Sequence, residues 1–178
     1  SPAYIGDTSN NITNVFLCND SLLIGRTDGL FNYDSDGGVH PLMDDLKHNR
    51  STNNFKYVVQ WQSATYFSLN TGLGEITAYD AFQPMGPLNK IDDIGKNGVC
   101  VGLGSDKDYL YVAMDEGTYS YIYKGREVKR QNGLRWEWCP WVYLADNACA
   151  TILVVQHSAT DRRLWFGYGN YMGFVRIY

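Results

Sequence analysis

Short apolar runs separated by polar turns dominate this chain, and the clearest example is the stretch Leu22–Tyr33. Its two arms are rich in aliphatic and aromatic residues. Gly29 stands at the corner between them, where a backbone with positive φ is expected. The stretch is therefore predicted to be a β-hairpin. Similar hairpins are predicted over residues 66–79, 109–123 and 164–178.

A small residue closes the first arm of each predicted hairpin. The four are Gly25, Ser68, Ala113 and Gly167, and they lie 43, 45 and 54 residues apart. A spacing near 45 is typical of β-propellers, in which repeats of about 40–50 residues each form a four-stranded blade. A small side chain suits the crowded contact between blades. We therefore predict an all-β fold, a β-propeller with about four blade-like repeats, although another antiparallel sandwich or barrel is the alternative.

The repeats are predicted to span residues 12–54, 55–97, 98–147 and 148–178 of a single domain, 1–178. Val39–Met43 is expected to be the outer strand of the first unit, because an edge strand tolerates Pro41. The second unit has no clear outer strand, since the prolines of 82–87 cannot donate to a ladder. The third unit is expected to contain a longer hairpin that ends near Tyr143. No outer strand follows Tyr178, so either the N-terminal residues supply it or the chain is an excerpt of a larger propeller, which we favour.

Composition supports a β-rich, non-helical chain. It has 178 residues, of which 15% are aromatic and 18 are glycine. Ten-residue windows show no apolar stripe of helical period, and no apolar run has the length of a membrane helix or the flanks of a signal peptide. The formal net charge of -4 gives no electrostatic reason to expect a nucleic acid as the main partner.

The search for catalytic motifs finds none. Nucleotide-binding, phosphate-loop, zinc-protease and serine-hydrolase signatures are absent from the sequence. Residues 102–106 contain two glycines and a serine, and we interpret them as a turn between strands. Adjacent carboxylates on a strand point to opposite faces, so the doublets 44–45, 92–93 and 115–116 are poor acid–base pairs. We expect no cofactor, no metal site and no catalytic residue. The four cysteines are scattered along the chain at positions 18, 100, 139 and 149. Cys18 and Cys100 lie in predicted first strands and are interpreted as buried apolar residues.

A basic segment precedes a cluster of tryptophans in the third unit. Basic groups beside aromatic rings can hold single-stranded nucleic acid or acidic sugars. The simpler interpretation, which we favour, is a solvated hairpin arm that leads into a buried aromatic strand. The residues are Lys124, Arg126, Lys129, Arg130, Arg135, Trp136, Trp138 and Trp141, with Glu127 among them.

The turns of the four hairpins are equivalent and should line one face together. Their polar and aromatic side chains suit a polar ligand, such as a surface glycan, or a protein partner. The candidate binding residues are Arg26, Asp28, Asn70, Asp115, Glu116, Asn170 and Tyr171.

Two resemblances to known proteins follow from particular segments. Residues 22–34, Leu-Leu-Ile-Gly-Arg-Thr-Asp-Gly-Leu-Phe-Asn-Tyr-Asp, resemble the blade motif of two-component regulator propellers, with Leu for Trp and Arg for Thr. The C-terminal half, from Trp136 to Arg162-Arg163-Leu164-Trp165-Phe166-Gly167-Tyr168-Gly169-Asn170, is similar to propellers of tail and virion-surface proteins of tailed bacteriophages. Both resemblances imply a propeller, and neither implies a catalytic residue.

These observations give three functional hypotheses. The first is a non-catalytic binding module of an extracellular or virion assembly, such as a phage tail, that contacts protein or glycan partners. The second is the ligand-sensing ectodomain of a bacterial two-component regulator. The third is a glycan-processing enzyme with carboxylates from different units. The first is preferred, and no nucleic acid or membrane insertion is expected in this segment.

Overall fold

The protein has an all-β fold. The structure, a computed structural model, describes residues 10–43, 50–70, 72–77, 82–85, 98–145 and 149–178. Its strands are β1 (Ile12–Cys18), β2 (Ser21–Arg26), β3 (Gly29–Tyr33), β4 (Val39–Met43), β5 (Val58–Trp61), β6 (Ala64–Leu69), β7 (Gly72–Thr77), β8 (Phe82–Met85), β9 (Val99–Ser105), β10 (Leu110–Asp115), β11 (Tyr119–Arg130), β12 (Gly133–Ala145), β13 (Cys149–Gln156), β14 (Arg162–Tyr168) and β15 (Tyr171–Ile177).

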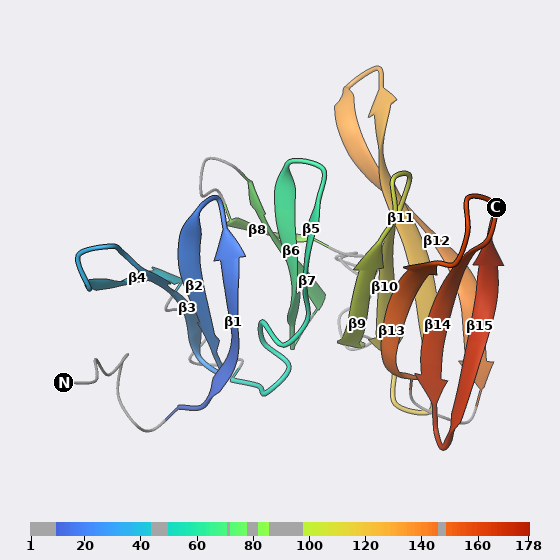
Figure 1. Cartoon of the computed structure of the whole chain (residues 1–178), viewed down its shortest axis with the longest axis horizontal. Coiled ribbons are helices and arrows are strands. Elements are labelled where there is room, and N and C mark those ends of the chain that lie inside the picture. The colour runs from blue at the N-terminus through green and yellow to red at the C-terminus, as the bar shows by residue number, and fades with distance from the viewer. Residues whose placement is uncertain (1–9, 44–49, 71, 78–81, 86–97, 146–148) are drawn as a thin grey trace.

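The strands form four antiparallel sheets, each built from consecutive strands. Sheet 1 is β1–β4, sheet 2 is β5–β8, sheet 3 is β9–β12 and sheet 4 is β13–β15. Figure 1 shows the sheets side by side in chain order, from sheet 1 at the left to sheet 4 at the right. The four predicted hairpins are confirmed as β2–β3, β6–β7, β10–β11 and β14–β15.

Two further strand predictions concern the outer parts of the sheets. Val39–Met43 is β4, and its Pro41 pairs with Phe31 at the sheet edge, as predicted. The longer hairpin of the third unit is also confirmed. Its strands, β11 and β12, contain 12 and 13 residues, and Figure 1 shows them projecting beyond the other strands of their sheet.

Three local expectations are wrong. Sheet 2 does have an outer strand, β8, in which Pro84 pairs with Gly74. A proline is tolerated there because β7 is the one described strand with which β8 pairs. Residues 102–106 do not form a turn, since β9 continues to Ser105. Gly29 does not need positive φ, because it is the first residue of β3 and pairs with Arg26; among the described residues, φ is positive at other glycines that include Gly72 and Gly117.

The hydrophobic core lies between the sheets and has three parts. The first part joins sheets 1 and 2 around Leu23, Phe55 and Phe67. The second joins sheets 2 and 3 around Trp61 and Val112. The third joins sheets 3 and 4, with Ile122, Ile152 and Leu164 among its residues. Each sheet therefore packs face to face on the next sheet along the chain.

The small residues that close the first hairpin arms lie in the second strand of each sheet. A Cβ atom on Gly25 would lie 2.4 Å from Cβ of Phe55, so the glycine is required by the chain that enters sheet 2. Ser68 and Ala113 are fully buried. Gly167 differs, because it lines an open apolar surface of sheet 4. Three of the four positions are thus explained by close packing.

The cysteines are free thiols. Cys18, Cys100 and Cys149 are buried, as predicted for the first two, and Cys139 is exposed on β12. The part of the chain that the structure describes contains no helix of the length and hydrophobicity needed to span a membrane.

Candidate functional site

The predicted binding turns all join the second strand of a sheet to its third strand. In Figure 1 the four turns lie along the lower side of the molecule. The turns of sheets 1 and 2 are held together by Asn54, whose side chain is fully buried. Its Nδ2 donates to Thr27 O at 2.9 Å, and its Oδ1 accepts from Asn70 N at 2.8 Å. One amide side chain therefore fixes the spacing of two neighbouring turns.

Arg26 does not belong to the exposed part of its turn. It is the last residue of β2, it is 2% exposed, and its Cζ lies 5.0 Å from the ring centre of Phe31. Its Nε lies 3.2 Å from Oδ1 of Asp28. The expectation that Arg26 presents its charge to a ligand is wrong, because the strand runs one residue further than the apolar pattern shows and carries Arg26 inside.

The other predicted turn residues divide into two groups. Asp115 and Glu116 act within their own turn: Asp115 Oδ1 accepts from Gly117 N at 2.8 Å, and Glu116 Oε1 accepts from the Tyr123 hydroxyl at 3.2 Å. Asn170 and Tyr171 are exposed, and Tyr171 is 75% exposed. Of the seven predicted binding residues, the two in the turn of sheet 4 are the exposed ones.

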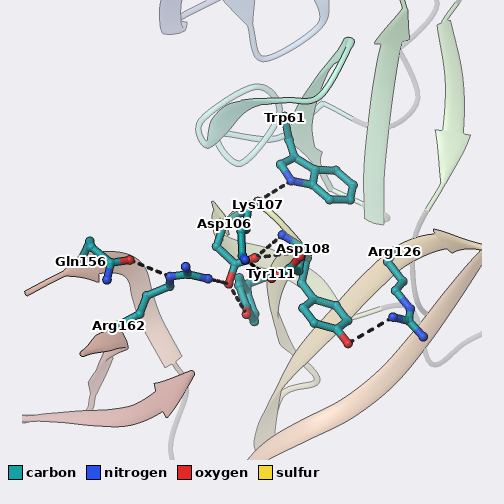
Figure 2. Close-up of polar contacts among 9 residues, drawn as sticks. Trp61, Asp106, Lys107, Asp108, Tyr111, Arg126, Gln156 and Arg162 are labelled. Atoms are coloured by element: carbon teal, nitrogen blue, oxygen red, sulfur yellow. Dashed lines mark hydrogen bonds and ion pairs between the residues drawn. The ribbon is translucent and has the colours of Figure 1, made fainter. Parts of the chain in front are cut away.

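A polar cluster that sequence reasoning missed lies around Asp106, directly after β9. Its Oδ1 accepts hydrogen bonds from the backbone N–H groups of Asp108, at 2.7 Å, and Tyr109, at 2.8 Å. Its Oδ2 accepts from the Tyr111 hydroxyl at 3.0 Å and from Arg162 Nη1 at 2.9 Å. Figure 2 shows these donors converging on one carboxylate, whose side chain is 3% exposed.

The Asp106 cluster connects three sheets. Trp61 at the end of β5 donates its Nε1–H to Asp106 O at 2.6 Å, and Arg162 comes from β14. Arg162 is fixed in turn by Gln156, whose Oε1 accepts from its Nε at 2.8 Å. Sheets 2, 3 and 4 therefore share one hydrogen-bonded node (Figure 2).

The electrostatics of this node keep Asp106 ionised. Burial on its own raises the pKa of the carboxyl, but the hydrogen bonds from the backbone of Asp108 and Tyr109, then from Arg162 and Tyr111, outweigh it, and the pKa of Asp106 is lowered. Burial and the charge of Asp106 raise the pKa of Tyr111. With both oxygens accepting two hydrogen bonds, Asp106 is suited to joining sheets rather than to transferring protons.

Sheet 4 has an apolar face that no described part of the chain covers. A cavity of about 480 Å³ on it is lined by Thr151, Leu153, Val155, Trp165, Phe166, Gly167 and Met172. Leu153 is 62% exposed and Met172 is 73% exposed. In sheet 3 the corresponding side of the sheet is covered by sheet 4. Large apolar side chains on this face of sheet 4 therefore remain in solvent.

The close contact between β9 and sheet 4 could have been predicted from the sequence. Gly102 and Gly104 alternate along β9, and Cβ atoms there would lie 2.8 Å from Ile152 N and 3.1 Å from Val154 Cγ2. Glycine at alternate positions in an apolar run indicates that another strand approaches closely. The pairing of Asp106 with Arg162 left no such signal, because the two residues are 56 positions apart.

Comparison with known proteins shows the fold. No protein family and no curated protein matches the sequence. Among solved structures, the chain is similar to the extracellular domain of the hybrid two-component system BT4673 from B. thetaiotaomicron, with 14% identity, 98% of this chain and 22% of that chain covered, and a TM-score of 0.69.

Two further structures give the same type of match. A structure of the BT4673 extracellular domain described as a one-component system has 14% identity, 99% and 23% coverage, and a TM-score of 0.61. The AfRom2 CNH domain has 13% identity, 99% and 55% coverage, and a TM-score of 0.53. The chain thus spans 22% and 23% of the lengths of the first two proteins.

Proposed function

We propose that this chain is four blades of an extracellular, ligand-sensing β-propeller. The observation that carries the proposal is the stack of four antiparallel sheets, which is similar over 98% of the chain to a regulator ectodomain. The resemblance of residues 22–34 to regulator blades supports it independently. None of the three similar structures is a virion protein, so the sensing alternative is now preferred to the phage-tail module.

The uncovered face of sheet 4 supports a propeller that extends further. Each of the three cores uses the faces of two successive sheets. Leu153, Trp165 and Met172 belong to one such face, which none of the described sheets covers. Among the described strands, sheet 4 has three where each other sheet has four, so β15 offers an edge for a further strand. A fourth strand would complete the edge at β15, and a further blade of the same kind would cover the apolar face.

The proposed role is binding without catalysis. The described carboxylates with the best-defined surroundings stabilise turns or join sheets, as Asp106 and Glu116 do. Exposed polar and aromatic side chains, such as Asn170 and Tyr171, would contact the ligand from the loops, while the sheets hold those loops in place. The ligand class is a polar molecule such as a glycan, or a protein surface.

The test is a screen of the full chain against neutral and acidic oligosaccharides. Thermal stability and product formation are measured in the same samples. A sensor raises its melting temperature with a particular ligand and leaves that ligand unchanged. Cleavage of an oligosaccharide by the protein would overturn the non-catalytic role. Copurification of the native protein with virus particles would return the preference to the virion module.

A further inference from the structure

The long hairpin of sheet 3 has two chemically different sides. Side chains alternate along a strand, so Gly125, Glu127 and Lys129 point one way and Lys124 and Arg126 point the other way. The ring of Trp138 lies over its cross-strand partner Gly125, where a Cβ atom would lie 2.4 Å from that ring. We call the side of the hairpin that holds Gly125 and Trp138 the aromatic side. We call the other side, which holds Lys124 and Arg126, the basic side.

The tryptophan rings on the aromatic side pack against other aromatic rings. Trp136 and Trp138 are stacked at 5.1 Å with an interplanar angle of 14°. Trp136 also lies 5.7 Å from Trp61 and 5.6 Å from Tyr66, both in sheet 2. This side of the hairpin is therefore used for packing against sheet 2.

The basic side borders an open cavity of about 460 Å³. Its lining is Tyr109, Lys124, Arg126, Glu137 and Cys139, together with Trp138 from the aromatic side. Two cations converge there on one ring: Lys124 Nζ is 5.2 Å and Arg126 Cζ is 5.5 Å from the ring centre of Tyr109. Arg126 Nη1 also donates to the Tyr109 hydroxyl at 3.5 Å.

The carboxylates near this cavity already form ion pairs or hydrogen bonds with other residues. Glu137 stands opposite Arg126 in the strand register, yet it forms its ion pair with Arg130. Asp106 is saturated by four donors, and Asp108 faces Lys107. Within the part of the chain that the structure describes, no ion pair involves Lys124 or Arg126. Two like charges on one side of one strand repel each other, and an anion between them would remove that repulsion.

We propose that this cavity binds a small organic di- or tricarboxylate. Lys124 and Arg126 are two residues apart, so their Cα atoms are separated by about 6.7 Å. Two carboxylates of one small molecule can therefore each meet a cation. The guanidinium of Arg126 offers a planar fork for one carboxylate, and the Lys124 ammonium offers a point charge for the other. The Tyr109 hydroxyl accepts from Arg126 and can donate its own proton to the ligand.

The same geometry argues against single-stranded nucleic acid. Such sites need aromatic platforms on which bases stack. Here the tryptophan rings of the hairpin pack on each other and on sheet 2, and Tyr109 is faced by both cations. The inference concerns this cavity alone and does not depend on the proposed sensing role.

The experiment is a calorimetric titration of the full chain with citrate, succinate and acetate. Citrate is expected to bind at least about tenfold more tightly than acetate, because it can engage both cations. Lys124→Ala and Arg126→Ala should each weaken citrate binding by about tenfold. Lys129→Ala removes the same charge from the other side of β11 and should leave binding unchanged. Melting temperatures establish that each variant is folded.

Three results would overturn the proposal. The first is equal binding of acetate and citrate, or no binding of either. The second is an equal loss of citrate affinity in Lys129→Ala, which would indicate a general charge effect. The third is displacement of citrate by a single-stranded oligonucleotide at a lower concentration than citrate itself requires, which would indicate a nucleic-acid site.

Discussion

Arg162 Nη1 lies 2.9 Å from Asp106 Oδ2 and so joins sheet 4 to sheet 3 across 56 residues of sequence. The Asp106 side chain is 3% exposed and the Arg162 side chain is 23% exposed, so the pair is much less accessible to water than a surface ion pair. Loss of one partner leaves the other charge poorly compensated.

Substitution of either partner is expected to destabilise the protein unequally. Asp106→Ala removes the acceptor of four hydrogen bonds and should lower the free energy of unfolding by about 3–5 kcal/mol. Arg162→Leu leaves three of the donors in place and should cost about 1–3 kcal/mol. Urea denaturation measures both. The control is Lys107→Ala, which breaks an exposed ion pair with Asp108 and should change stability by less than about 1 kcal/mol. An equally large loss in Lys107→Ala would contradict the argument.

The lowered pKa of Asp106 predicts a specific dependence of stability on pH. An unfolded aspartate has a pKa of about 3.9, so the stabilisation from the ionised carboxylate is complete above that pH. It is lost as the pH falls below about 4 toward the lower pKa of the folded state. The difference in unfolding free energy between the natural protein and Asp106→Asn should therefore shrink between pH 6 and pH 2.5. A constant difference over this range would show that the charge of Asp106 is not what stabilises the node.

Two glycines of β9 provide a matched pair of substitutions. A Cβ atom on Gly102 would lie 2.8 Å from the backbone nitrogen of Ile152, which cannot move without shifting β13. On Gly104 it would lie 3.1 Å from Val154 Cγ2, the end of a side chain that can adjust. Gly102→Ala should therefore lower the unfolding free energy by about 1–3 kcal/mol, and Gly104→Ala by less than about 1 kcal/mol. Chemical denaturation measures the unfolding free energy of both variants. A larger loss in Gly104→Ala than in Gly102→Ala would contradict the argument.

The thiols should differ sharply in reactivity. Burial raises the pKa of Cys100 to about 12 and that of Cys149 to about 11, so neither forms the reactive thiolate at pH 8. Cys18 is also buried, whereas Cys139 is exposed. Titration with a coloured disulfide reagent should detect one fast thiol in the folded protein and four in urea. Cys139→Ser should abolish the fast phase, and a fast phase that persisted in this variant would contradict the burial of the other three.

The sequence was sufficient for the hairpins because their strands pair with immediate neighbours. Apolar arms joined by glycine-containing turns and the repeat of small residues identified them. The longer last spacing between the small residues placed the long hairpin that ends near Tyr143. It was insufficient for β8, because Pro84 argues against a strand unless its edge position is known. Arg26 was misplaced because a charged residue beside a turn is normally exposed.

The candidate sites were harder to predict than the strands. Asp106 follows a glycine-containing strand and looks like an ordinary turn residue until Arg162 approaches it from another sheet. The basic residues of the long hairpin were visible in the sequence. Which of them share a side, and which ring they meet, depends on the register of β11 with β12. Contacts between sheets therefore carry the information that a single sequence does not show.

The division of the core into three interfaces has a thermodynamic consequence. As in a repeat protein, each sheet should be energetically coupled only to the sheets that adjoin it. Paired substitutions at Phe67 and Leu164, which belong to different interfaces, should thus have additive effects. Trp61 and Arg162 belong to sheets that are not neighbours, yet both bond to Asp106. Substitutions at Asp106 should therefore affect the stability of sheets 2, 3 and 4 together, in contrast to substitutions within a single interface.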